Sequence, residues 1–167
     1  MVYISYPTYY VTFCTRDRTK IPSLESAQKA IELYRRVGIE KSNIHLNYYV
    51  VMPDHVHVLV HGNFGFDLSS WVGGLKRAIS KGIEAKPSFW QPGFFDRVLR
   101  SEESAEVKWF YLRDNPVRAG LVRHFEDWPF RRLDLEDAAD TAASTGRKRK
   151  SAAETAAVSE KSDGRRE

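Results

Sequence analysis

The sequence predicts an α+β domain with a ferredoxin-like antiparallel sheet, in the order βαββαβ, followed by one added helix. Three observations support this class. Segments rich in β-branched and aromatic residues alternate with segments whose apolar residues have helical spacing. The 167 residues suffice for one core of ordinary size. Cys14 is the only cysteine, so neither an internal disulfide nor a cysteine-based zinc site stabilises the fold.

The first three expected elements are a strand, a helix and a strand. Residues 9–15 (YYVTFCT) are β-branched and aromatic, which favours a strand. Ser23 is a suitable helix N-cap, and residues 24–38 carry apolar side chains at helical spacing, with Gly38 as the expected stop. Residues 43–52 (NIHLNYYVVM) return to a strand pattern.

Four further elements complete the predicted domain. The dipeptide Pro53-Asp54 predicts a turn into a third strand at 55–61 (HVHVLVH). A second helix is expected over 68–83, a fourth strand over 95–99, and a last helix over 104–114. Pro116 is expected to end that helix, because proline cannot continue it.

Composition changes after Leu133 and divides the chain into a folded domain, 1–133, and a low-complexity tail, 134–167. The tail has no aromatic residue, so it cannot bury enough apolar surface to offset the entropy of ordering, and we expect it to be disordered. It holds 7 Lys/Arg and 8 Asp/Glu, which leaves 19 basic and 14 acidic residues in the domain. The folded part is therefore the basic part, which favours a nucleic-acid partner.

The third strand places two histidines on one of its faces. Because side chains alternate across a strand, His55 and His57 share a face and lie about 7 Å apart. The valines between and beyond them point the other way and can pack against helices. Two such imidazoles can bind one metal ion, but the same pattern also occurs on ordinary sheet surfaces. Spacing alone leaves both interpretations open.

The last helix carries a tyrosine and an amide on one face. Tyr111 and Asn115 are four residues apart, about one helical turn. An amide oxygen beside two imidazoles gives a mixed N/N/O site with positions open for substrate oxygens. A metal there would polarise a phosphoryl oxygen, and Tyr111 would then be the nucleophile. The alternative is that Tyr111 is simply a packed aromatic residue.

Three strings resemble the single-tyrosine HUH transposases, most closely the REP-associated tyrosine transposases: VVMPDHVHVLVHG (50–62), WQPGFFDRVLRSEES (90–104) and YLRDNPVRAGLV (111–122). The opening YYVTFCTRDR (9–18) is similar to the first strand of that family. The resemblance covers about residues 9–130, with the motifs in the family's order.

The resemblance implies a metal-dependent enzyme that cleaves and rejoins single-stranded DNA next to a hairpin, such as a repetitive palindromic element. By position, His55, His57 and Asn115 match the ligands of a divalent metal, Mg²⁺ or Mn²⁺, and Tyr111 matches the nucleophile. The implied products are a 5′-phosphotyrosine and a free 3′-hydroxyl. Two imidazoles suit Mn²⁺ better than Mg²⁺ on grounds of hardness. Whether the active form is a monomer or a homodimer stays open.

Several basic residues are candidates for DNA contact: Lys76, Arg77, Lys81, Arg97, Arg118, Arg131 and Arg132. A solvated helix face is the competing interpretation for the first four, and Arg118 could instead cap the C-terminus of its helix. Arg131 and Arg132 stand where the family commonly has two serines. Trp90 and Phe94 either stack on unpaired bases or pack in the core.

Two other functions are compatible with the same residues. One is a hairpin-DNA or RNA-binding module without catalysis, because ferredoxin-like sheets also bind RNA through exposed aromatic residues. The other is a hydrolase in which water attacks. With neither a signal-peptide pattern nor a long apolar run in this sequence, we expect a cytoplasmic, nucleoid-associated protein.

Overall fold

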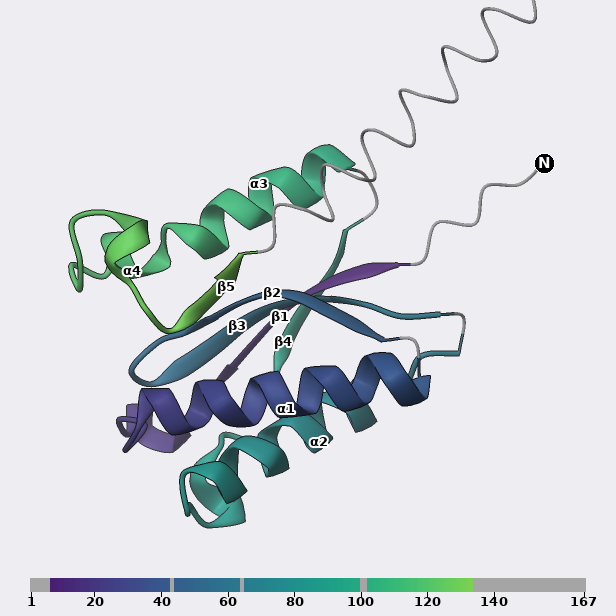
Figure 1. The fold of residues 1–167 in the computed structure, drawn as a ribbon, viewed down its shortest axis with the longest axis horizontal. Coiled ribbons are helices and arrows are strands. Elements are labelled where there is room, and N and C mark those ends of the chain that lie inside the picture. The colour runs from purple at the N-terminus through teal and green to yellow at the C-terminus, as the bar shows by residue number, and fades with distance from the viewer. Residues whose placement is uncertain (1–6, 43, 64, 100–101, 134–167) are drawn as a thin grey trace, which may run out of the picture. The chain divides into compact units, whose positions relative to one another are not determined.

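Five antiparallel strands form one sheet in the order β4-β1-β3-β2-β5. The structure is a computed structural model and describes residues 7–42, 44–63, 65–99 and 102–133 (Figure 1). The strands are β1 (Thr8–Cys14), β2 (His45–Val51), β3 (His55–His61), β4 (Phe95–Leu99) and β5 (Arg131–Leu133). The order 4-1-3-2 of the first four strands, with two helices as crossovers, is the ferredoxin-like arrangement that the sequence predicts.

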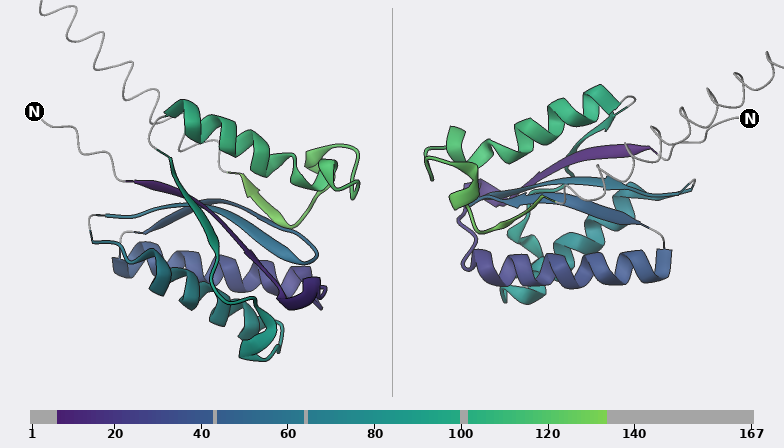
Figure 2. Two further views of the ribbon diagram at one scale, coloured as in Figure 1. Left: turned by 180° about the vertical axis from the view of Figure 1, so that it is seen from behind. Right: turned by 45° about the horizontal axis from the view of Figure 1, so that its top comes forward.

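Helices lie on both faces of the sheet (Figure 1, Figure 2). Helices α1 (Leu24–Ser42) and α2 (Leu68–Gly82) cover one face. Helices α3 (Glu102–Arg113) and α4 (Asn115–Arg118) lie on the other. Short 3-10 turns complete the order: η1 (Arg16–Arg18) after β1, η2 (Pro87–Phe89) before β4, and η3 (Phe125–Asp127) before β5.

The alternation along β3 separates two apolar clusters. Val56, Val58 and Val60 are fully buried in the cluster that includes α1 and α2. Leu59, on the opposite face, belongs to a second cluster with Tyr10, Val50, Met52, Leu99, Leu112 and Trp128. The histidines of β3 share the face of this second cluster, so helix α3 packs over the side of the sheet that carries them.

Most predicted bounds lie within two residues of the observed ones, and two differences at helix ends have a clear physical cause. Helix α1 continues through Gly38 to Ser42. A glycine inside a helix costs only about 1 kcal/mol, and Gly38 lacks the positive φ of a helix-ending glycine. Helix α3 ends at Arg113, before Pro116 as expected, but Pro116 then lies in the first turn of α4. Proline is tolerated there because that position needs no N–H donor.

Strand β5 is an addition that the sequence pattern does not predict. Its three residues pair with Tyr48, Tyr49 and Val50 of β2. The segment Arg-Arg-Leu has no readable period of two, so only the pairing with β2 makes it a strand. The predicted disordered tail, 134–167, lies outside the described residues, and the division of the chain at Leu133 stays a prediction.

Candidate active site

His55 and His57 point toward each other from β3, with their Nε2 atoms 3.1 Å apart. His57 is 6% exposed, whereas His55 is partly exposed. At this distance the two nitrogens share one hydrogen bond, for which one of them carries the proton. A cation that displaced this proton would find two nitrogen lone pairs in its place.

The outer nitrogen of each imidazole has its own partner. His55 Nδ1 donates to the Asp54 carboxylate at 2.6 Å, which leaves the His55 Nε2 lone pair facing His57. His57 Nδ1 lies 2.7 Å from Thr12 Oγ1 and 2.9 Å from Tyr10 Oη. Such partners fix the orientation of an imidazole and raise its basicity as a ligand.

His57 is held in its neutral form. Burial, then the coulombic interaction with the neighbouring His55, lowers the pKa of His57 to about 3, although the Asn115 side chain acts in the opposite direction. A neutral imidazole is the protonation state that binds a metal ion.

Asn115 and Tyr111 meet this pair from the helical side. The Asn115 side chain is close enough to His57 to raise the pKa of that imidazole, and its Nδ2 donates to the Tyr111 carbonyl oxygen at 2.7 Å. The amide therefore joins the end of α3 to β3. The Tyr111 ring meets the Tyr10 ring edge to face at 6.3 Å, and Tyr10 stacks against His57. The structure thus brings together the four residues that the sequence singles out.

The two tyrosines of the site are not equivalent. Tyr111 is 39% exposed, whereas Tyr10 is 3% exposed. Burial raises the pKa of Tyr10, so its hydroxyl stays protonated beside His57. Only Tyr111 is reachable by a substrate in solution.

Four residues that support the site were not among those predicted from the sequence. Asp54, Thr12 and Tyr10 hold the outer nitrogens of the histidines. The Lys108 ammonium lies 5.3 Å from the Tyr111 ring and 5.4 Å from the Tyr10 ring. Asp54 precedes His55 in the sequence, so a contact between them could have been predicted. Thr12 and Tyr10 come from β1, 45 and 47 residues away from His57, and no local pattern indicates their contact with it.

Within the described ranges, no group of three or more His, Cys, Asp or Glu side chains is arranged to hold a metal ion. A metal ion at the histidine pair would therefore need a ligand of another type. The amide of Asn115, close enough to His57 to raise its pKa, is a side chain that could supply it.

Residues 4–114 match the family described as "Transposase IS200 like", which is about two thirds of the chain. The chain belongs to the IS200-like transposase family. The matched range includes both histidines and Tyr111, and Asn115 is the first residue after it.

Two relatives of this transposase are REP-associated tyrosine transposases. It is 27% identical over 132 residues to "REP-associated tyrosine transposase" of Escherichia coli (strain K12), an alignment that covers 77% of each chain. It is 21% identical over 136 residues to "Putative REP-associated tyrosine transposase" of Haemophilus influenzae, covering 73% of this chain and 77% of the relative. These matches confirm the resemblance to this group that the motifs indicate.

A solved structure has the same fold. It is described as "Structure of the REP associates tyrosine transposase bound to a REP hairpin" and superimposes with a TM-score of 0.65 at 27% identity. The match covers 78% of this transposase and 79% of that chain.

The predicted DNA contacts of the transposase fall on different faces. Arg118 lies over the Tyr111 ring at 4.5 Å. Arg97 pairs across strands with Tyr10 and so shares the histidine face. Arg131 instead binds the carbonyl oxygens of Phe125 and Glu126. Arg132 lies 3.5 Å from Glu32 of α1.

The three cations of α2 lie on the face of the sheet opposite the histidines. Lys76, Arg77 and Lys81, together with Arg16, line a hollow of about 510 Å³ beside η2. Lys76 donates to the carbonyl oxygens of Gln91 and Gly93. The structure therefore separates these cations from the histidine pair by the thickness of the sheet.

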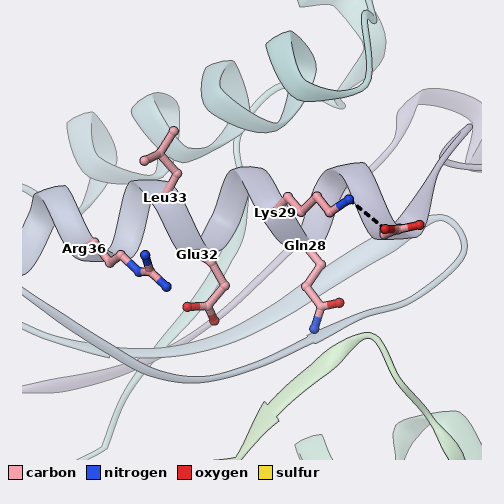
Figure 3. A pocket seen from close by; sticks show the side chains of 6 residues that line it. Gln28, Lys29, Glu32, Leu33 and Arg36 are labelled. Atoms are coloured by element: carbon pink, nitrogen blue, oxygen red, sulfur yellow. Dashed lines mark ion pairs between the residues drawn. The ribbon is translucent and has the colours of Figure 1, made fainter.

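A pocket of about 440 Å³ along α1 does not belong to the candidate site (Figure 3). It contains both signs of charge, and one of its ion pairs joins Lys29 to Glu25 at 2.7 Å. It includes neither histidine nor Tyr111.

In the described part of the chain, none of the helices has the length and apolarity that crossing a bilayer requires.

Proposed function

We propose that this transposase cleaves single-stranded DNA next to a hairpin and rejoins it through a phosphotyrosine at Tyr111. The histidine pair and Asn115 would hold the divalent metal ion, Mg²⁺ or Mn²⁺, on which the reaction depends. The observation that carries the proposal is the convergence of His55, His57, Asn115 and an exposed Tyr111 on one face of the sheet.

The donor atoms fit a divalent metal ion. Two Nε2 atoms face each other, and each ring is oriented through its other nitrogen. The Asn115 amide adds an oxygen donor, which hard cations prefer. Two imidazoles favour Mn²⁺ over Mg²⁺. When bound, such an ion would act as a Lewis acid toward a phosphoryl oxygen.

The protein's own groups position the nucleophile. Arg118 and Lys108 lie near the Tyr111 ring, 4.5 and 5.3 Å from its centroid. Two cations beside the phenol favour the approach of a phosphate and offset the negative charge of the transition state. Tyr10 and Thr12 hold the His57 ring in place through its Nδ1 atom.

The reaction is a transesterification. Tyr111 Oη attacks the phosphorus of the scissile phosphodiester, and the Oη–P bond forms as the P–O3′ bond breaks. The phenol loses its proton and the departing 3′ oxygen gains one, so the products are a 5′-phosphotyrosine and a 3′-hydroxyl. No water is consumed, and attack by a 3′-hydroxyl on the phosphotyrosine restores a DNA strand.

The hairpin part of the proposal draws on the relatives. The matched solved protein is described as bound to a REP hairpin, and the curated relatives are named REP-associated. The cations that share the histidine face, Arg97, Lys108 and Arg118, support binding of a phosphate backbone there.

The test compares wild type with Tyr111→Phe on a labelled single-stranded hairpin oligonucleotide in Mn²⁺, followed by a denaturing gel. We expect a slowly migrating protein–DNA adduct with the wild type only, and none in EDTA. Tyr111→Phe should still bind the hairpin, because it removes one hydroxyl. Cleavage without an adduct would favour a hydrolase. Binding without cleavage would leave a hairpin-binding module.

The metal ligands are tested by His57→Ala. This variant should lose Mn²⁺ binding and cleavage together, because it removes one of two nitrogen donors. Full activity of His57→Ala in limiting Mn²⁺ would show that the proposed ligand set is wrong.

A further inference from the structure

Phe95 is an exposed aromatic side chain on the same face as the histidine pair. It begins β4, an edge strand of the sheet, and is 62% exposed. An exposed phenylalanine leaves apolar area in water that folding normally buries. Trp90 and Phe94 do not have this property: Trp90 is buried against Phe13, and Phe94 packs against the larger core cluster.

The strand register connects Phe95 to the site. Phe95 pairs with Thr12 of β1, and Thr12 pairs with His57 of β3. Directly paired residues share a face of the sheet. Phe95, Thr12 and His57 therefore form one row across three strands, two strand spacings or about 10 Å from end to end.

The neighbouring row adds a cation to this face. Arg97 pairs with Tyr10, and Tyr10 contacts both His57 and Tyr111. The Lys108 ammonium also lies 5.4 Å from the Tyr10 ring. An exposed aromatic ring beside cations on an open sheet edge is the combination that binds unpaired nucleotides, with the ring stacking on a base and the cations beside phosphates.

We propose that Phe95 and Arg97 form a subsite for an unpaired nucleotide next to the phosphate that Tyr111 attacks, with Phe95 stacked on its base. This inference rests on the proposed function, because it takes the ligand to be single-stranded DNA. Phe95 selects for an unpaired base, since a base inside a duplex has no free face. The subsite explains how the transposase would distinguish a single-stranded flank from the paired stem of a hairpin.

Val98 provides a matched control on the same strand. It is 43% exposed, but it pairs with Tyr9 and so lies on the opposite face of the sheet. Phe95→Ala and Val98→Ala both shorten an exposed apolar side chain of β4, and neither should change the melting temperature by much. Only Phe95→Ala removes a ring from the histidine face.

The experiment measures binding in EDTA by fluorescence anisotropy, with a labelled hairpin that has a single-stranded arm and with the same hairpin lacking the arm. Phe95→Ala should weaken binding of the armed hairpin at least about fivefold, the lower end of what one stacked base contributes. It should leave the blunt hairpin unaffected, and Val98→Ala should match the wild type on both. Phe95→Trp should retain the wild-type affinity.

A second measurement changes the DNA and compares the wild type with Phe95→Ala. One abasic nucleotide is placed at each position of the arm in turn. It should weaken binding by the wild type at one position only, and at that position it should not weaken binding by Phe95→Ala any further. Equal losses on armed and blunt hairpins would overturn the subsite, as would a change of oligomeric state in Phe95→Ala. Binding is measured in EDTA, where no cleavage is expected, so this test is independent of catalysis. If Phe95→Ala weakened binding of the armed hairpin in EDTA but the wild type formed no Tyr111 adduct in Mn²⁺, the subsite would be supported and the catalytic proposal refuted.

Discussion

Asp54→Asn tests whether the carboxylate beside His55 prepares this histidine to bind metal. Asp54 Oδ1 accepts the His55 Nδ1 proton at 2.6 Å, which keeps the Nε2 lone pair directed at His57. An asparagine can turn its NH₂ toward Nδ1, and the proton would then move to Nε2 and block the ligand position. Loss of such a partner lowers metal affinity about 10- to 100-fold, or about 1.4–2.7 kcal/mol.

The fold should tolerate this substitution. The backbone carbonyl of Asp54, not its side chain, accepts hydrogen bonds from Thr15 N and Oγ1 at 2.9 and 3.0 Å. The contact of the carboxylate with Arg18 is 3.5 Å long, and the Arg18 side chain is 60% exposed, so its loss costs at most about 1 kcal/mol. The melting temperature without metal should therefore change little.

The assay is a calorimetric titration of Mn²⁺ without DNA. Asp17→Asn is the matched control, because Asp17 is an exposed aspartate with a positive φ that asparagine also adopts readily. If Asp54→Asn bound Mn²⁺ as tightly as Asp17→Asn, while His55→Ala lost binding, Asp54 would have no part in preparing the ligand.

Two further predictions concern stability. Leu112 is fully buried between α3 and the sheet, so Leu112→Ala should lower the free energy of unfolding by about 2–5 kcal/mol in urea. Leu121 is 41% exposed, so Leu121→Ala should change the free energy of unfolding by no more than about 0.5 kcal/mol. Equal losses of stability in the two variants would mean that α3 does not pack as described. Burial raises the pKa of Glu32, but the Tyr49 hydroxyl at 2.8 Å and the guanidinium groups of Arg35 and Arg132 outweigh it, so the pKa lies below 4.5. The contribution of Glu32 is therefore present above about pH 4.5 and is lost as the pH falls through its folded pKa. The stability difference between wild type and Glu32→Gln should shrink under acid, and a difference independent of pH would contradict this.

Much of the architecture follows from local patterns in the sequence. The valines and histidines of β3 alternate, and this alone predicts which side chains face a core and which face the site. Helix spacing likewise predicts that Tyr111 and Asn115 lie near each other, and the Asn115 Nδ2–Tyr111 carbonyl bond agrees with it. Such inferences succeed because they depend on neighbours within a few residues.

Only the tertiary structure decides which elements meet. Tyr10 and Thr12 reach His57 because β1 pairs with β3, and no local pattern reports that register. The same arrangement places Lys76 of α2 on the face of the sheet opposite the histidines and Phe95 on the histidine face, although the sequence of either segment is compatible with DNA binding. Sequence by itself determined the chemistry available to this transposase: two imidazoles, an amide, a phenol and many cations. The packing of distant segments determined which of these groups share one face, because strand order and helix placement depend on contacts between residues far apart in the chain.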